Sequence, residues 1–157
     1  MKKLNNPFVQ FEGYNCYACD PYNQEGLQMS FYEDGEYILS EWEPRSYLQG
    51  YLNVLHGGIQ STLMDEIASW VVYVKVKRAG VTASMDIKFR KPVYVNRGKI
   101  IVRGKLNEIV SKFASIRGEL FDHEDNLCAE AEIKYLVYPE EVARKKLYYP
   151  GHEAFYR

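Results

Sequence analysis

Apolar and polar residues alternate along several segments of this sequence, as expected for β-strands with one buried face. Leu27, Met29 and Phe31 share one face of the first such segment, and a strand over 37–42 completes a predicted hairpin. Four more strand-like segments follow in the second half of the chain, at 81–91, 98–109, 112–121 and 127–138. Because the connections between them are short, we predict that these four form an antiparallel meander.

One long segment, from Gly58 to Val76, has a helical period instead. At about 100° per residue its large apolar side chains gather on one side: Ile59, Leu63, Ile67, Trp70 and Val74. Asp65 falls nearly opposite, beside the small residues Ser61 and Ala68. A solvated face and a contact with a second surface both explain this pattern, since small residues allow close approach.

These elements predict a single domain over the 157 residues. It divides into an irregular segment 1–26, a core 27–138 and a C-terminal extension 139–157, which opens with a short helix that ends at Lys146. A chain of this length buries about 70% of its unfolded surface, so it needs neither a metal nor a disulfide to fold.

The cysteine count and the apolar runs indicate in which cellular compartment the protein is expected. The three cysteines cannot all pair with one another, which favours a reducing compartment. Residues 1–10 lack the apolar stretch of a signal peptide. The apolar run Ile67–Val74 is far shorter than the ~20 residues that cross a bilayer. We therefore expect a cytoplasmic protein.

The net charge of −1 argues against capture of nucleic acid or of an anionic membrane by bulk electrostatics. This total hides a local imbalance. Residues 75–105 contain ten Lys or Arg and only one acid, Asp86, whereas residues 33–43 contain five acids and no base. The basic segment is suited to a discrete ligand that carries several phosphates.

The strongest chemical signal lies where the predicted helix begins. Gly57 and Gly58 follow His56 there, and glycines at a helix start leave the backbone N–H groups open to a ligand. Such donors suit a carbonyl oxygen that gains negative charge during acyl transfer. Asp65, about two turns further on, can attack as a nucleophile or activate water. The residues alone leave a loop end with an incidental acid as an equal alternative.

The stretches 49–58 and 63–66 resemble the signature of PaaI-like hotdog-fold acyl-CoA thioesterases, in which a His-Gly-Gly motif precedes an acid by nine positions. The resemblance extends through Thr82–Pro92 and covers roughly residues 14–138. It implies an α+β hotdog fold, in which a curved antiparallel β-sheet wraps around one long central helix. It also implies a homodimer or dimer of dimers, with active sites at the subunit interface.

Carried over to this sequence, the resemblance implies hydrolysis of a small or medium acyl-CoA thioester. The Gly57 backbone N–H would polarise the thioester carbonyl, Gly58 would shape the helix start, and His56 would orient the loop or the substrate. Asp65 would be the nucleophile or general base, and the Thr82 hydroxyl would position water. No cofactor is expected, because coenzyme A is part of the substrate.

Substrate-binding residues are expected on both sides of the motif. Many relatives carry an Asn six residues before the motif His, where this sequence has Gly50. Asn53 and Gln60 are therefore the candidates to hold the attacking water. Arg90 and Lys91 are suited to the phosphates of coenzyme A, although a solvated strand end explains them equally.

Cys16 and Cys19 have the spacing of half a zinc site or of a redox pair. No second pair is present, because Cys128 falls on a predicted strand and His123 in a turn. We therefore expect no metal site and leave the role of the two cysteines open. Glu66 points about 100° away from Asp65, which favours a structural role.

Two other functions remain in view. The first is a hotdog hydratase or dehydratase that acts on acyl thioesters, which generally needs a second His and acid pair. The second is a hotdog protein that binds acyl-CoA without catalysis, an alternative that Gly50 favours.

Overall fold

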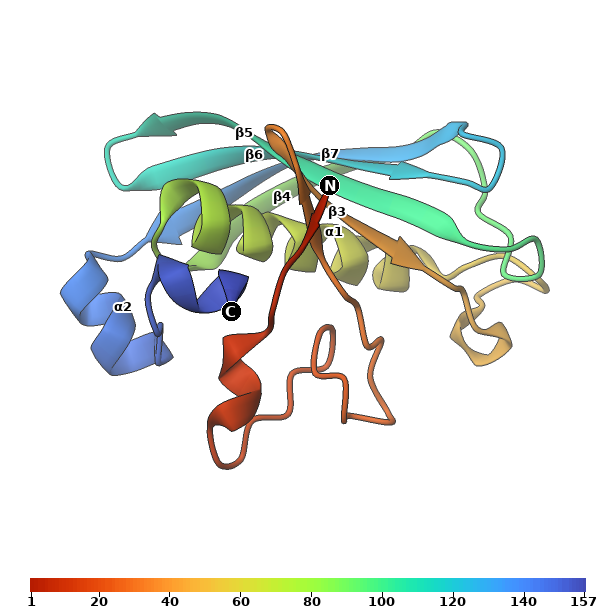
Figure 1. Cartoon of the computed structure of the whole chain (residues 1–157). Coiled ribbons are helices and arrows are strands. Elements are labelled where there is room, and N and C mark those ends of the chain that lie inside the picture. Colours follow the sequence, from red (N-terminus) through yellow and green to blue (C-terminus); the bar gives the residue numbers. More distant parts are fainter.

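The computed structural model describes residues 1–157, and in it a curved antiparallel sheet covers one side of a long helix, α1 (Gly57–Val71) (Figure 1). The helix continues as a π-helical turn to Val76. The strands are β1 (Lys2–Lys3), β2 (Tyr32–Asp34), β3 (Tyr37–Trp42), β4 (Gly80–Phe89), β5 (Ile100–Val110), β6 (Phe113–Phe121) and β7 (Leu127–Val137). A short helix, α2 (Glu140–Leu147), follows the sheet. This architecture confirms the α+β hotdog fold. None of the helices combines the length and the apolar character needed to cross a bilayer.

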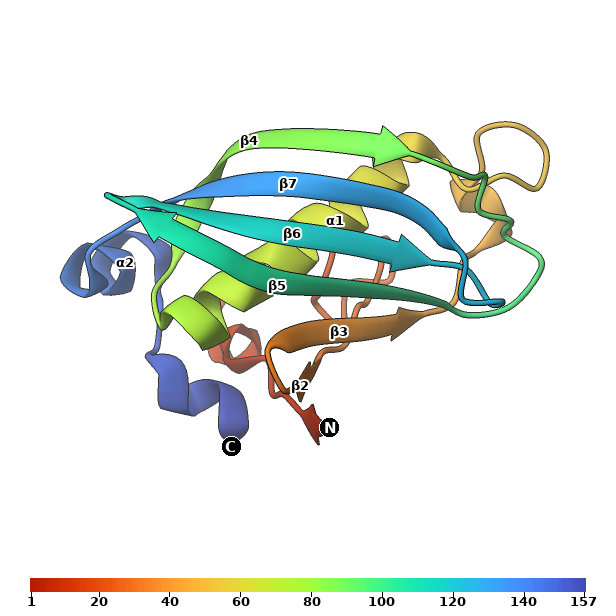
Figure 2. The ribbon, with the colours of Figure 1, turned by 90° about the horizontal axis from the view of Figure 1, so that it is seen from above.

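The strand order is β1-β2-β3-β5-β6-β7-β4, with every pair antiparallel. The predicted meander is therefore confirmed for β5, β6 and β7 but wrong for β4, which pairs with β7 and not with β5 (Figure 2). The reason lies in residues 90–99, which form a longer connection than the sequence indicated. Val93 and Val95 of this connection are buried and bond to the loop before α1, by Leu55 N–H to Val93 O and Val95 N–H to Asn53 O.

The predicted hairpin forms, because β2 pairs antiparallel with β3, but its first strand begins at Tyr32 and not at Leu27. Leu27, Met29 and Phe31 are buried, as their alternation indicated, but no strand pairs with them. Their segment bonds to the N-terminal loop instead, through Leu27 N–H to Tyr17 O and Met29 N–H to Ala18 O. The segment 1–26, predicted to be irregular, contains one short strand, β1, and one 3-10 turn beside its loops.

The core lies between α1 and the inner face of the sheet. Ile67 of the predicted apolar face is buried there, beside Gly104 of the sheet. Trp70 of the same predicted face is also buried, but it packs against Phe31 and Phe155 of the terminal segments. Gly104 of β5 lets the helix approach the sheet, because a Cβ at this position would come within 3.0 Å of Val71. The side of α1 that the sheet leaves open is covered by the N-terminal segment and the C-terminal end of the chain (Figure 1). Two sides of α1 therefore have different surroundings. One side faces the edge of the sheet, and the other faces the N-terminal segment and the C-terminal end of the chain.

Candidate active site

Asp65 sits in the middle of α1, where its carboxylate meets two hydroxyl groups from the sheet. The Thr82 hydroxyl of β4 donates a hydrogen bond of 2.7 Å to Asp65 Oδ1, and the Tyr135 hydroxyl of β7 donates one of 2.9 Å to the same oxygen. The Tyr135 hydroxyl also lies 2.9 Å from the Asp65 carbonyl oxygen. Asp65 Oδ2 has no hydrogen-bond partner within the chain. One oxygen is thus held in place while the other is free to meet water or a substrate.

Tyr135 is the site residue that sequence reasoning missed. It occupies an inward-facing position of β7 and is only 4% exposed, so its place in the alternation indicated packing alone. Burial and the nearby Asp65 charge raise the pKa of Tyr135 well above its usual range, which keeps the phenol protonated as a donor. A signal was present, because a buried tyrosine hydroxyl generally needs a polar partner.

The start of α1 leaves one backbone donor free. His56 is the N-cap, and its Nδ1 accepts a hydrogen bond of 2.8 Å from the Gly58 N–H. The Gly57 N–H has no partner within the chain. Since a helix N-terminus carries partial positive charge, this free N–H is placed to donate to an anionic oxygen. The His56 side chain therefore occupies the Gly58 N–H, whereas the Gly57 N–H stays available to a ligand.

A cavity of about 280 Å³ adjoins this helix start. Its lining residues are Gly50, Tyr51, Val54, Leu55, His56 and Gly57. A Cβ at Gly50 would lie 3.5 Å from the His56 ring, which is ordinary van der Waals contact. Position 50 therefore has room for a Cβ beside His56.

The two candidates for holding water are placed differently from one another. Gln60 is 4% exposed, and its Nε2 donates to the Leu55 carbonyl, so it supports the loop before α1 from inside. Its Oε1 is buried without a partner. Asn53 lies in that loop with a positive φ of 63°, and its backbone N–H donates to the Gln49 side chain.

Arg90 and Lys91 follow the last residue of β4, at the end of the strand that reaches the start of α1 (Figure 2). Both are exposed, and both backbone N–H groups donate to the Cys128 carbonyl. Arg90 also forms an ion pair of 3.4 Å with Glu130. Their side chains are accessible to a ligand, and that ion pair would have to be exchanged for a phosphate contact.

Gly57 and Asp65 of one chain are too far apart to act on one thioester. Asp65 is eight positions after Gly57 on the helix, which corresponds to about 12 Å along the axis. Reacting groups must lie within about 3–3.5 Å of the atom on which they act. The structure therefore brings Asp65 together with Thr82, and His56 with Gly57 and Gly58, as two half-sites.

Glu66 lies outside both half-sites, although it follows Asp65 in the sequence. Its carboxylate accepts a hydrogen bond of 3.3 Å from Trp70 Nε1 and faces Cys16 of the N-terminal segment. Burial raises the pKa of Glu66 to about 7, and the neighbouring Cys16 adds to this shift.

Comparison with known proteins identifies the family. The sequence model described as the Thioesterase superfamily matches residues 52–129, which include both half-sites except Tyr135. A search of curated proteins finds no match.

Solved structures share the fold at low sequence identity. A hypothetical thioesterase from Streptococcus pneumoniae, solved with coenzyme A, superposes with a TM-score of 0.66 and 17% identity, over 71% of this chain and 90% of that chain. The Escherichia coli PaaI protein has a TM-score of 0.65 and 14% identity, over 73% of this chain and 82% of that one. A thioesterase superfamily protein with a TM-score of 0.67 and 18% identity is longer: the match covers 74% of this chain and 57% of that chain. On the family match and the hotdog architecture together, the chain belongs to the thioesterase superfamily.

Proposed function

We propose that this protein is a PaaI-like acyl-CoA thioesterase that hydrolyses a small or medium acyl-CoA to the free acid and coenzyme A. The observation that carries the proposal is the Asp65 carboxylate, with one oxygen held by Thr82 and Tyr135 and the other free. A carboxylate oriented in this way needs no rearrangement before it reacts, which is the condition for efficient acid–base or nucleophilic catalysis.

The reaction adds water across the thioester. As general base, Asp65 Oδ2 takes a proton from the water whose oxygen attacks the carbonyl carbon. As nucleophile, it attacks that carbon itself, and water then cleaves the resulting anhydride. In both routes the carbon–sulfur bond breaks, and the thiolate of coenzyme A leaves and takes up a proton. The carbonyl oxygen carries negative charge meanwhile, and the free Gly57 N–H is the proposed donor to it.

The active site is proposed to form between two copies of the chain. β4 is an edge strand, and its exposed residues include Val81 and Phe89, at 39% and 53% exposure. Thr82 of this strand contacts Asp65, whereas a Cβ at Gly57 would contact Phe89, so β4 runs antiparallel to α1. If two β4 strands pair antiparallel about a twofold axis near their middle, Asp65 faces the partner subunit's Gly57. That pairing removes the separation of about 12 Å within one chain.

Two observations support coenzyme A as part of the substrate: a strongly basic segment of the chain and the similarity to a solved structure. The segment 75–105 is strongly basic, and Arg90 and Lys91 lie at the end of β4 nearest the start of α1. The similar thioesterase from Streptococcus pneumoniae was solved with coenzyme A.

A free-thiol assay over straight-chain and aromatic acyl-CoA substrates tests the proposal. Asp65→Asn should lower the rate on an active substrate by about 10²–10⁴-fold, which is the usual contribution of general-base catalysis. Asp125→Asn is the matched control, since Asp125 lies in an exposed turn with a positive φ of 62° that Asn also tolerates. Wild-type turnover by Asp65→Asn would refute the catalytic assignment.

A mixed-dimer experiment tests the shared site. Asp65→Asn and Gly57→Pro chains should each be inactive as homodimers, but a heterodimer retains one site with both groups intact. Random mixing of equal amounts should therefore restore about a quarter of wild-type activity, since half of the dimers are mixed and each has one working site of two. No recovery in a mixture that contains heterodimers would exclude a site built from two chains.

A protein that binds acyl-CoA without catalysis is the second candidate, and the absence of the usual Asn at Gly50 favours it. Tight binding of acyl-CoA with no thiol release across the panel would establish this alternative. Mass spectrometry after incubation with enoyl-CoA distinguishes the hydratase, which adds water and leaves the thioester whole.

A further inference from the structure

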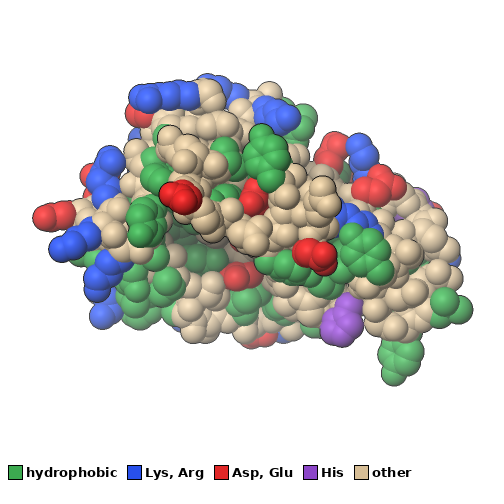
Figure 3. All heavy atoms as spheres, turned by 90° about the horizontal axis from the view of Figure 1, so that it is seen from below, with side chains coloured by type: hydrophobic (Ala, Val, Ile, Leu, Met, Phe, Trp, Pro, Cys, Tyr) green, Lys and Arg blue, Asp and Glu red, His purple; other side chains and the backbone are tan.

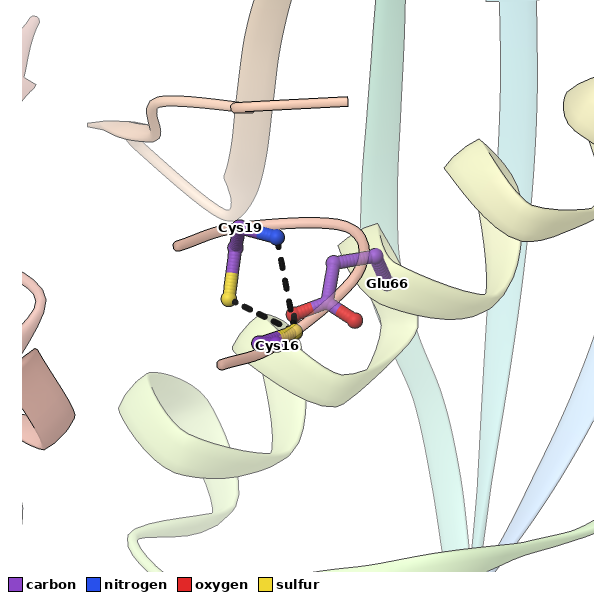
Figure 4. Close-up of side chains that lie close together, drawn as sticks. All are labelled: Cys16, Cys19 and Glu66. Carbon is purple, nitrogen blue, oxygen red and sulfur yellow. Dashed lines mark hydrogen bonds between the residues drawn. The ribbon is translucent and has the colours of Figure 1, made fainter. Parts of the chain in front are cut away.

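Three potential metal ligands meet beneath α1, although they lie far apart in the sequence. Cys16 and Cys19 come from the N-terminal segment, and Glu66 comes from α1, 50 residues after Cys16 (Figure 4). The two sulfur atoms are 3.4 Å apart, and Cys16 Sγ is 3.9 Å from Glu66 Oε1. All three ligand atoms lie within 4.8 Å of one another. The sequence showed only two of these ligands, which was too few to predict a site.

Hydrogen bonds within the loop that carries the cysteines fix its conformation. The Cys19 N–H points at Cys16 Sγ at 3.4 Å, and Asn23 Nδ2 donates to the Cys16 carbonyl at 3.3 Å. Gly26 closes the loop tightly, because a Cβ there would come within 2.3 Å of the Tyr17 carbonyl oxygen. An N–H aimed at a sulfur stabilises the thiolate, which is the form that binds metals.

Glu66 is oriented from the other side by Trp70, which donates its indole N–H to Glu66 Oε1 at 3.3 Å. Trp70 is 1% exposed and stacks on Phe31 with 4.0 Å between ring centroids, so the donor is firmly placed. A hydrogen-bonded partner that orients a carboxylate ligand is a regular feature of metal sites.

The surroundings lack a positive charge to balance these groups. The three residues line a cavity of about 510 Å³, together with Phe8, Phe11, Glu12, Gly13, Tyr14, Ser69, Tyr73, Gly80, Leu147 and Tyr148. This lining contains two carboxylates and two thiols but no Lys, Arg or His. Glu66 forms no ion pair. The face that contains this region is hollowed, with hydrophobic side chains around the hollow (Figure 3). A bound cation would supply the missing charge.

We propose that Cys16, Cys19 and Glu66 bind one Zn²⁺ ion. Thiolates select soft or borderline cations, and a carboxylate completes ligand sets for zinc. With zinc bonds of about 2.3 Å to sulfur and 2.1 Å to oxygen, tetrahedral ligands lie about 3.8 Å apart for two sulfurs and about 3.6 Å apart for sulfur and oxygen. The distances of 3.4 and 3.9 Å match these values within a few tenths of an ångström.

Three protein ligands leave one tetrahedral position for water, and the cavity that these residues line has room for it. The Tyr14 hydroxyl hydrogen-bonds with Cys19 Sγ at 3.2 Å and orients that ligand from outside the coordination shell. The ion joins the N-terminal segment to α1 at the residue next to Asp65. This zinc site is independent of the proposed hydrolysis, because Glu66 contacts neither half-site.

Direct metal binding by the full chain tests the proposal. Protein stripped with a chelator and kept reduced should take up one equivalent of Zn²⁺, measured by elemental mass spectrometry and by competition with a chromogenic chelator. Co²⁺ should give the charge-transfer band of a cobalt–thiolate bond and the visible bands of a tetrahedral ion. Zn²⁺ should also raise Tm in proportion to the logarithm of its concentration once the site is saturated. Failure of the folded, reduced protein to bind Zn²⁺ would overturn the proposal.

Two variants and a control locate the ligands. Cys16→Ser and Glu66→Gln should each weaken Zn²⁺ binding by more than about 100-fold, since loss of even an orienting partner typically costs 10–100-fold. Cys128→Ser should retain wild-type affinity, because Cys128 lies on β7 and lines no part of this cavity. Glu66→Gln keeps the side-chain size, so it tests the site even if Cys16→Ser folds poorly. An affinity of Glu66→Gln within threefold of wild type, or a stable Cys16–Cys19 disulfide that persists in reducing buffer, would contradict the assignment.

Discussion

Asp65 and Glu66 are neighbours in the sequence but lie in opposite chemical environments on α1. Asp65 faces the edge of the sheet, where two hydroxyl groups donate to one of its oxygens. Glu66 faces the N-terminal segment, where two thiols lie close and no base is present. The comparison shows that the same functional group meets different chemistry according to its neighbours. The hydroxyl donors support the proposed catalytic role of Asp65, whereas the thiols without a countercharge support the proposed cation site at Glu66.

The strongest test of this difference between Asp65 and Glu66 is to replace each acid in turn with its amide. Asp65→Asn should lower thioester hydrolysis by about 10²–10⁴-fold and leave Zn²⁺ stoichiometry at one per chain. Glu66→Gln should abolish stoichiometric Zn²⁺ binding and keep hydrolysis within about tenfold of wild type. The free-thiol assay and elemental analysis, applied to both variants, measure whether each substitution removes one property and leaves the other. If either substitution removed both properties, the two sides of α1 would not be separate sites.

The next largest effect concerns the helix start that completes the Asp65 side. Gly57→Pro deletes the N–H that is free at the start of α1, and Pro is well tolerated at the first position of a helix. His56 has ψ of 133°, which suits a residue before proline. We expect kcat to fall about 10²–10³-fold, as for the loss of one oxyanion donor.

Gly57→Ala is the control for this variant, because it retains the N–H and its Cβ has room beside Phe89. A kcat for Gly57→Pro equal to that of Gly57→Ala would show that this N–H does not take part in the reaction.

Tyr135→Phe tests how much a hydroxyl donor to Asp65 contributes to the reaction. It removes one hydrogen bond to the Asp65 carboxylate and preserves the ring in the core. A hydrogen bond to a charged group contributes about 1.5–3 kcal/mol, so kcat/KM should fall about 10–100-fold. Zn²⁺ affinity, measured in parallel, should not change. A variant that loses stability and zinc affinity but not activity would make Tyr135 a packing residue only.

The smallest expected effect is on the Glu66 side. Trp70→Phe removes the indole donor to Glu66 Oε1, so Zn²⁺ affinity should fall about tenfold. Hydrolysis should stay within threefold of wild type, because Trp70 contacts neither half-site. Competition with a chelator, together with Tm to correct for the lost packing against Phe31, measures this effect. Unchanged affinity in a folded variant would mean that the indole does not orient the carboxylate.

The fold was largely predictable, because burial leaves a periodic trace in the sequence. The long helix was expected over 58–76 and extends over 57–76, with its π-helical turn included. The strand pattern that starts at Leu27 becomes a strand only from Tyr32 on, so residues 27–31 are the part of that prediction that failed. Alternation reports which side chains are buried, and this segment buries them while its backbone bonds to a loop.

The order of the strands was predictable only in part. Hairpins join strands that are neighbours in the sequence, which is why β5, β6 and β7 were placed correctly. The place of β4 beside β7 depends on the connection over 90–99, which is anchored on the loop before α1. No local pattern carries that information, since it arises from contacts between distant segments.

The sequence by itself determined the helix, most of the strands and the spacing of His56, the two glycines and Asp65. Those features depend on local periodicity and on residue types a few positions apart. Only the tertiary structure decided that Tyr135 donates to Asp65 and that Cys16 and Cys19 meet Glu66. These contacts join residues that are 47 to 70 positions apart, so they depend on how the strands pair and where the N-terminal segment folds back. Sequence spacing predicts chemistry within one element, and packing decides it between elements.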